Sequence, residues 1–94
     1  LCFDTLSGRY FKSDIEKIKR TINEMNSALF SSMWCSVNEL YLELGLDPIR
    51  LGDDTGWEVN SGLIDPNFSS QLTEDGKPCL VLDFSTRPKY DYRD

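Results

Sequence analysis

The segment SDIEKIKRTINEMNSAL, residues 13–29, decides the fold, because its apolar residues recur at steps of three and four. This spacing is typical of an amphipathic helix that buries one stripe against a core. The stripe consists of Ile15, Ile18, Ile22, Met25 and Leu29. Ser13 and Glu16 match the Ser-x-x-Glu capping box, which predicts the start of the helix. We expect this helix to extend to about Ser32.

A shorter segment, SVNELYLELG at residues 36–45, repeats the same pattern. Ser36 and Glu39 predict a second capping box. Gly45 is typical of the left-handed residue that ends a helix. The chain must change direction between the two helices, and we expect Trp34 to anchor that turn in the core.

Short alternating segments follow the second helix. Residues 63–72 and 79–85 flank an Asp-Gly turn signal, which predicts an antiparallel hairpin. Pro66 places the first of these strands at a sheet edge or a bulge. Residues 1–11 read as a further hairpin or extended pair. The pattern therefore predicts a single domain, residues 1–94, of the α+β class: two helices packed on one face of a small antiparallel β-sheet, a meander.

Composition excludes several classes of function. The chain carries 16 acidic and 10 basic residues and no histidine, giving a net charge of −6. So acidic a chain is a poor candidate for direct nucleic-acid binding or for an anionic membrane surface. Without histidine, Ser-His-Asp and Cys-His catalytic systems cannot form, and no glycine-rich phosphate loop is present. We expect no enzymatic activity and no cofactor.

The cysteines are Cys2, Cys35 and Cys79. Their odd number and the absence of a Cys-x-x-Cys pair argue against a zinc site and a disulfide scaffold. Free thiols in a reducing compartment are the expectation, although one bridge with one thiol left over remains open. No run approaches the ~18 apolar residues that a membrane span needs. We expect a cytoplasmic protein.

Acidic residues concentrate in residues 39–83, which hold ten acids against Arg50 and Lys77. This region is either a solvated face or a docking surface for a basic partner. Asp47, Asp53 and Asp54 could also bind a divalent metal through oxygen ligands. Their spacing does not match the EF-hand, and such residues are common in turns, so we expect no metal.

The C-terminal tail, TRPKYDYRD at residues 86–94, interleaves bases with tyrosines. Such a tail either stacks on a binding partner or packs its tyrosines against the domain. Trp57 is likewise either an exposed interaction anchor or a core residue. The candidate interaction surface comprises Asp47, Asp53, Asp54, Trp57, Glu58, Arg87, Lys89, Tyr90 and Tyr92.

Four stretches carry a resemblance to a known family: DTLSGRYFKSDIEKIKR, LGLDPIRLGDDTGW, GLIDPNFSSQLTEDGKPCLVLDF and RPKYDYRD. In this order they resemble the C-terminal soluble part of an uncharacterised family encoded by phages and prophages of Gram-positive bacteria. The resemblance implies an N-terminal region with membrane segments that is missing from this chain, which agrees with its start at Leu1. The family has no known catalytic residues to carry over.

Three hypotheses follow. The first is a non-enzymatic interaction or structural module of a phage-related protein, held on the cytoplasmic side of a membrane in the full-length protein, which contacts itself or a host or phage protein. The second is an acidic inhibitor that mimics phosphates and blocks a host nucleic-acid-binding defence protein. The third is a metal-dependent enzyme centred on Asp47, Asp53 and Asp54.

Overall fold

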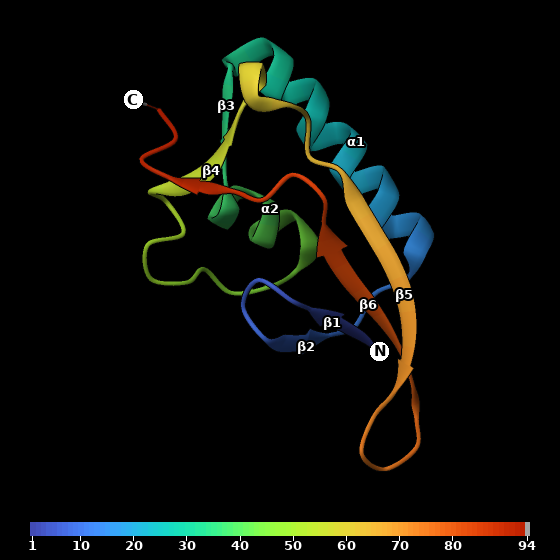
Figure 1. Cartoon of the computed structure of the whole chain (residues 1–94). Helices are drawn as coiled ribbons and strands as arrows, with labels where there is room; N and C mark the ends of the chain where they lie inside the picture. Colours follow the sequence, from blue (N-terminus) through green and yellow to red (C-terminus); the bar gives the residue numbers. More distant parts are fainter. Residues whose placement is uncertain (94) are drawn as a thin grey trace.

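The structure is a computed structural model that describes residues 1–93, and it confirms the α+β class (Figure 1). Its helices are α1 (Ile15–Ser32) and α2 (Val37–Leu44), with a short 3-10 helix η1 (Val59–Ser61). Its strands are β1 (Cys2–Asp4), β2 (Arg9–Phe11), β3 (Trp34–Ser36), β4 (Thr55–Glu58), β5 (Pro66–Leu72), β6 (Pro78–Phe84) and β7 (Lys89–Tyr90).

The strands form two sheets, where the sequence predicted one antiparallel meander. A four-stranded sheet has the order β2-β1-β6-β5, and a three-stranded sheet has the order β3-β4-β7. In the first sheet β1 runs parallel to β6, with Cys2 opposite Leu80. The meander was wrong because side-chain alternation shows which face a residue takes, and it does not show which strand lies beside it or in which direction.

Helix α1 begins one residue later than its sequence pattern predicted. Its N-cap is Asp14, whose carboxylate accepts a hydrogen bond from the backbone N–H of Lys17 at 2.9 Å. The predicted capping box of Ser13 and Glu16 is therefore wrong, and the Ser13 hydroxyl oxygen is buried without a hydrogen-bond partner. The helix ends at Ser32, as predicted, and Met33 follows in the left-handed conformation.

Helix α2 confirms its predicted ends. The Ser36 hydroxyl accepts from the Glu39 N–H at 3.1 Å, and the Glu39 carboxylate accepts from the Ser36 N–H at 3.3 Å. Gly45 follows the helix at φ 88°. Trp34 is 39% exposed, so the expectation that it anchors the core is wrong. It alternates along β3 with Cys35, which takes the buried side instead.

One hydrophobic core joins the helices and both sheets. The α1 stripe contributes four fully packed residues, and burying each is worth roughly 1.5–3 kcal/mol. The buried members of the core cluster are Cys2, Phe11, Ile18, Ile22, Met25, Leu29, Cys35, Val37, Leu40, Tyr41, Leu44, Leu46, Trp57, Ile64, Leu82 and Phe84. On the apolar face of β6, Leu82 and Phe84 lie in this core and Leu80 packs against it, but Val81 on the opposite face is buried as well, so the strand is less one-sided than its alternation predicted.

Two asparagines fix the connecting loops through their carboxamides. Asn38, which is 4% exposed, donates to the Ile49 carbonyl at 3.1 Å and accepts from the Ile49 N–H at 2.8 Å. Asn26 makes the same two-sided contact with the backbone of Ile64, both bonds at 2.9 Å. Asn38 thereby holds the loop after α2, and Asn26 holds the segment before β5 against α1.

The β5–β6 hairpin extends beyond the rest of the molecule (Figure 1). With the hairpin included, the molecule measures 43 × 25 × 20 Å along its principal axes. Ile64 is buried and Phe68 is half-buried, but Leu72 on the same face is 72% exposed. Pro66 begins β5, which is an edge strand, as its position in the sequence predicted. The outer half of the hairpin therefore carries an apolar side chain without a neighbour in the core.

Candidate binding pocket at the C-terminal strand

Strand β7 brings the C-terminal tail onto the central strand of the smaller sheet. Thr55 lies opposite Tyr90 and Gly56 opposite Lys89. Gly56 is required for close packing, because a Cβ atom there would lie 2.1 Å from the carbonyl oxygen of Cys35. The tail therefore pairs with β4, and β4 pairs on its other side with β3.

Trp57 fastens the segment that leads into β7. Its indole N–H donates to the Thr86 carbonyl at 2.7 Å, and its ring lies at a tilt to Phe84 with centroids 5.6 Å apart. The side chain is 2% exposed. Of the two alternatives for Trp57, the core position is the one observed. Its buried side chain forms part of the pocket wall described below.

Tyr92 fastens the far end of the tail. It is 7% exposed, and its hydroxyl donates to the Asp53 carbonyl at 3.4 Å. The backbone N–H of Asp91 donates to the Asp54 carbonyl at 2.9 Å, and Asp91 adopts φ 55°. By contrast, Tyr90 is 60% exposed. One tyrosine of the tail therefore packs against the domain, and the other faces outward.

A pocket of about 450 Å³ lies between β4 and the tail. This volume falls within the range of sites that bind small molecules or side chains of a partner. Six of the nine predicted interaction residues line it: Trp57, Glu58, Arg87, Lys89, Tyr90 and Tyr92. The fold therefore unites two stretches that the sequence analysis had singled out separately.

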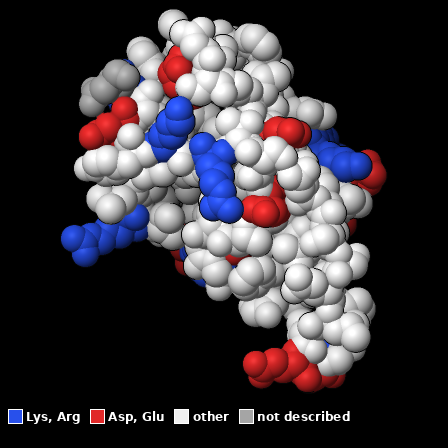
Figure 2. Space-filling view, viewed as in Figure 1, with Lys and Arg blue, Asp and Glu red and all other residues white. Residues whose placement is uncertain are grey.

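Charged side chains of both signs surround the pocket, and they differ in whether they are free to bind a ligand. Both carboxylate oxygens of Glu58 are used within the chain, accepting from the Asn60 N–H at 2.8 Å and the Ser61 hydroxyl at 3.1 Å. Arg87 and Lys89 are exposed. Figure 2 shows the same mixture on the face in view, where acidic and basic groups are interspersed and no continuous acidic surface forms.

The three aspartates of the predicted acidic site have separate positions. Asp53 and Asp54 border a smaller hollow of about 160 Å³ beside Tyr92, whereas Asp47 lies outside both pockets and its carbonyl accepts from Arg9 at 2.8 Å. Asp53 also accepts from the Asn38 carboxamide at 3.2 Å. Among residues 1–93, no three His, Cys, Asp or Glu side chains group closely enough to hold a metal ion.

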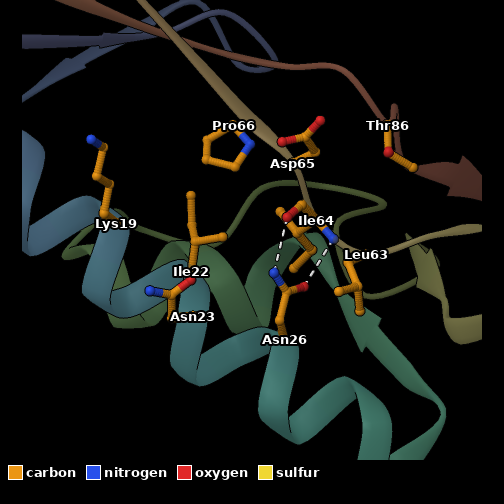
Figure 3. Close-up of a pocket in the computed structure, with 9 residues that line it drawn as sticks. All are labelled: Lys19, Ile22, Asn23, Asn26, Leu63, Ile64, Asp65, Pro66 and Thr86. Atoms are coloured by element: carbon orange, nitrogen blue, oxygen red, sulfur yellow. Dashed lines mark hydrogen bonds between the residues drawn. The ribbon is translucent and has the colours of Figure 1, made fainter.

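A third hollow, of about 590 Å³, lies between α1 and the segment that precedes β5 (Figure 3). Figure 3 shows the Asn26 side chain turned toward Ile64, with both of its hydrogen bonds committed to that backbone. Lys19, on the same rim, lies over the Phe68 ring at 5.8 Å. The sequence analysis proposed no binding site among the residues around this hollow, because only the tertiary fold places residues 63–66 beside α1.

The buried carboxylate of Asp4 lies away from these three hollows. Asp4 is fully buried, and one of its carboxylate oxygens accepts from the Ser7 hydroxyl at 2.6 Å and the Tyr41 hydroxyl at 2.7 Å. Burial, and then the contact with Asp4, raise the pKa of Tyr41. This arrangement joins the β1–β2 turn to α2.

Burial affects the chemistry of two of the three thiols. Cys2, Cys35 and Cys79 are free, as expected from their odd number and spacing, and all three are buried. Burial, followed by the nearby Glu39 carboxylate, raises the pKa of Cys35 to about 12. Burial also raises the pKa of Cys2. A thiol with a raised pKa stays protonated at neutral pH and reacts slowly.

Together these features define a small α+β domain with a pocket of mixed charge at its C-terminal strand. The chain belongs to DUF6353, a family of unknown function, whose model matches residues 1–93. Neither a curated protein nor a solved structure matches the chain. Within the described residues, neither helix combines the length and apolar composition that a membrane-spanning helix requires.

Proposed function

We propose that this domain is a non-enzymatic protein-interaction module that binds its partner at the C-terminal pocket. The observation that carries this proposal is the arrangement of Arg87, Lys89 and Tyr90 on the pocket rim. All three side chains are exposed, while Trp57 and Tyr92 hold the tail in place beneath them. Aromatic and arginine side chains on a rigid support are typical of binding hot spots.

The chemistry of the rim indicates what the partner presents. The carboxylate of Glu58 is bonded within the chain and the exposed Asp91 is the other acid that lines the pocket, so the bases Arg87 and Lys89 are in excess among the free charges of the rim. They favour a partner segment that carries carboxylates beside an apolar or aromatic side chain, which would contact Tyr90. The partner is a protein, because a chain of net charge −6 repels nucleic acid.

Site-specific photo-crosslinking in cells that express the full-length protein tests this proposal. A photoreactive phenylalanine analogue replaces Tyr90 in one variant and Tyr10 in a control. Tyr10 is 55% exposed and lies on β2, in the other sheet. We expect a discrete adduct from position 90 only, reduced when Arg87 and Lys89 are both changed to alanine. Equal crosslinking at the two positions, or no adduct at position 90, refutes the proposed surface.

We propose further that the domain belongs to a phage-related protein and works on the cytoplasmic side of a membrane. The support is the sequence resemblance to the soluble part of a phage and prophage family whose members carry N-terminal hydrophobic segments. Fractionation of cells that express the full-length protein should place it with membranes, and protease added from the cytoplasmic side should remove this domain. A full-length protein found in the soluble fraction would contradict the tether.

No observation favours the phosphate-mimic alternative. That function requires a row of free carboxylates, but several acids of residues 39–83 serve the fold. Asp53 accepts from Asn38, Glu58 caps η1, and Asp83 accepts from the Thr5 hydroxyl at 2.9 Å. The interaction module is therefore the function that the geometry supports best.

A further inference from the structure

Strand β5 has an unpaired outer edge. It is the last strand in the order β2-β1-β6-β5, so only one of its sides meets another strand within residues 1–93. Two hydrogen bonds show which backbone groups of this segment point toward β6. The Ser85 N–H donates to the Asp65 carbonyl, and the Thr73 N–H donates to the Lys77 carbonyl, both at 2.8 Å. Along an antiparallel strand, the N–H and C=O groups of successive residues point to opposite sides. The backbone groups of odd-numbered residues therefore point toward β6, and those of even-numbered residues point outward.

The outward groups are the N–H and C=O of Phe68, Ser70 and Leu72. Within residues 1–93, no backbone or side-chain group forms a hydrogen bond to them, and Ser70 and Leu72 are exposed. Each copy therefore presents three donors and three acceptors in one regular row. A row of this kind is a template for pairing with a further strand.

This edge lacks the features by which proteins usually protect exposed strands. Natural edges are short, bulged, or marked by charges and proline. Strand β5 has seven residues, pairs with β6 without a bulge, and contains no charged side chain. Pro66 lies only at its first position. The opposite edge of the same sheet, β2, has three residues and includes Arg9.

We propose that β5 pairs antiparallel with β5 of a second copy, about a two-fold axis at Ser70. In this register Phe68 of one copy lies opposite Leu72 of the other, and the two Ser70 residues lie opposite each other. All three outward N–H groups of each copy then meet a carbonyl. The two four-stranded sheets become one continuous sheet.

The proposed register also explains the exposed Leu72. Phe68 and Leu72 share one face of β5, and Phe68 is half-buried while Leu72 is 72% exposed. Cross-strand neighbours in an antiparallel pair approach to about 5 Å, so each Leu72 would pack on the Phe68 ring of the other copy. The absence of charge along the strand means that two copies meet without local repulsion, although each carries −6 overall.

The dimer should be weak and dependent on concentration, because five paired residues bury less surface than a standard stable interface. Sedimentation velocity over a wide range of concentration measures it. Ser70→Pro is the sharpest variant, since it removes an N–H that faces outward and leaves the β5–β6 ladder intact. We expect roughly thirtyfold weaker dimerisation, from the two symmetric hydrogen bonds that are lost. Ser70→Ala keeps the N–H and should dimerise as the parent does.

Disulfide trapping tests the register itself. Residues opposite each other in a hydrogen-bonded antiparallel pair lie about 5.5 Å apart at Cα, which a disulfide can span. Ser70→Cys should therefore form a covalent dimer under mild oxidation, whereas Leu72→Cys, placed opposite Phe68, should not. The three native thiols are buried and should react little.

A chain that stays monomeric, a dimer that Ser70→Pro does not weaken, or equal trapping at positions 70 and 72 overturns the proposal. Pairing of this edge with a peptide of another protein, seen without any self-association, overturns it as well. Strand β5 contributes no residue to the C-terminal pocket, so these results leave the proposed function untouched. Circular dichroism of each variant verifies that the monomer remains folded.

Discussion

Replacing Asn38 with alanine should destabilise the domain by about 3 kcal/mol. The change removes two hydrogen bonds to the backbone of Ile49, worth ~1 kcal/mol each, and one to the Asp53 carboxylate, worth ~1.5 kcal/mol or more. It leaves the Ile49 N–H without a partner in a part-buried site, while the Ile49 C=O still accepts from the Gly52 N–H at 3.1 Å. This loss is a large fraction of the 5–15 kcal/mol that typically holds a small domain folded.

Urea denaturation followed by circular dichroism measures the effect as a lower midpoint. Asn60→Ala is the matched control, because Asn60 is exposed, and it should change stability by less than about 0.5 kcal/mol. A loss below about 1 kcal/mol for Asn38→Ala would show that water replaces the carboxamide and that Asn38 does not organise the loop.

Asn38→Asp separates the hydrogen bonds from the shape of the side chain. The new carboxylate has nearly the same volume, but it cannot donate, and it lies beside Asp53. Burial and the neighbouring negative charge raise its folded-state pKa above the unfolded value. Folding therefore favours the protonated form. The contribution of this carboxyl group to the free energy of unfolding is complete at low pH and is lost as pH rises through its folded-state pKa. The difference from the parent chain should shrink on acidification, and a difference that does not vary with pH would contradict this account.

Three further predictions concern stability. Asp14→Ala should cost ~1 kcal/mol in a urea titration because it removes the N-cap of α1, whereas Ser13→Ala should cost less than ~0.5 kcal/mol. Gly56→Ala should destabilise by more than ~2 kcal/mol, because its Cβ would meet the Cys35 carbonyl, while Gly76→Ala, in open space at φ 80°, should cost ~1 kcal/mol. The raised pKa of Cys35 means that its contribution to stability is complete below its ordinary value of 9.0 and is lost as pH rises toward about 12, with a slope approaching ~1.4 kcal/mol per pH unit. Cys35→Ala should flatten this alkaline slope, and an unchanged slope would assign it to other groups such as Tyr41.

The elements that could be predicted from the sequence are those fixed by neighbouring residues. The capping box of α2 joins positions three residues apart, and Gly45 acts on the turn beside it, so both were predicted correctly. The predicted start of α1 was wrong by one residue, although it too depends on neighbouring residues. Ser13 and Asp14 are adjacent and both able to cap, and the choice between them depends on the direction from which the chain enters the helix.

Features that depend on distant residues could not be predicted in this way. Trp34 and Trp57 lie in similar short strands that pair next to each other, yet one is exposed and the other buried. Their difference comes from which face of the small sheet meets the core. The pocket shows the same limit, since its residues were named individually, but their meeting depends on the pairing of β7 with β4.

The position of β1 has a consequence for synthesis on the ribosome. This strand lies between β2 and β6, and its parallel partner is separated from it by most of the chain. A nascent polypeptide must therefore expose the β1–β2 hairpin until the last third of the domain has left the exit tunnel. Pairing between such distant segments is slow, because the intervening chain must first be ordered. A chaperone that shields the early hairpin during synthesis should raise the yield of folded protein.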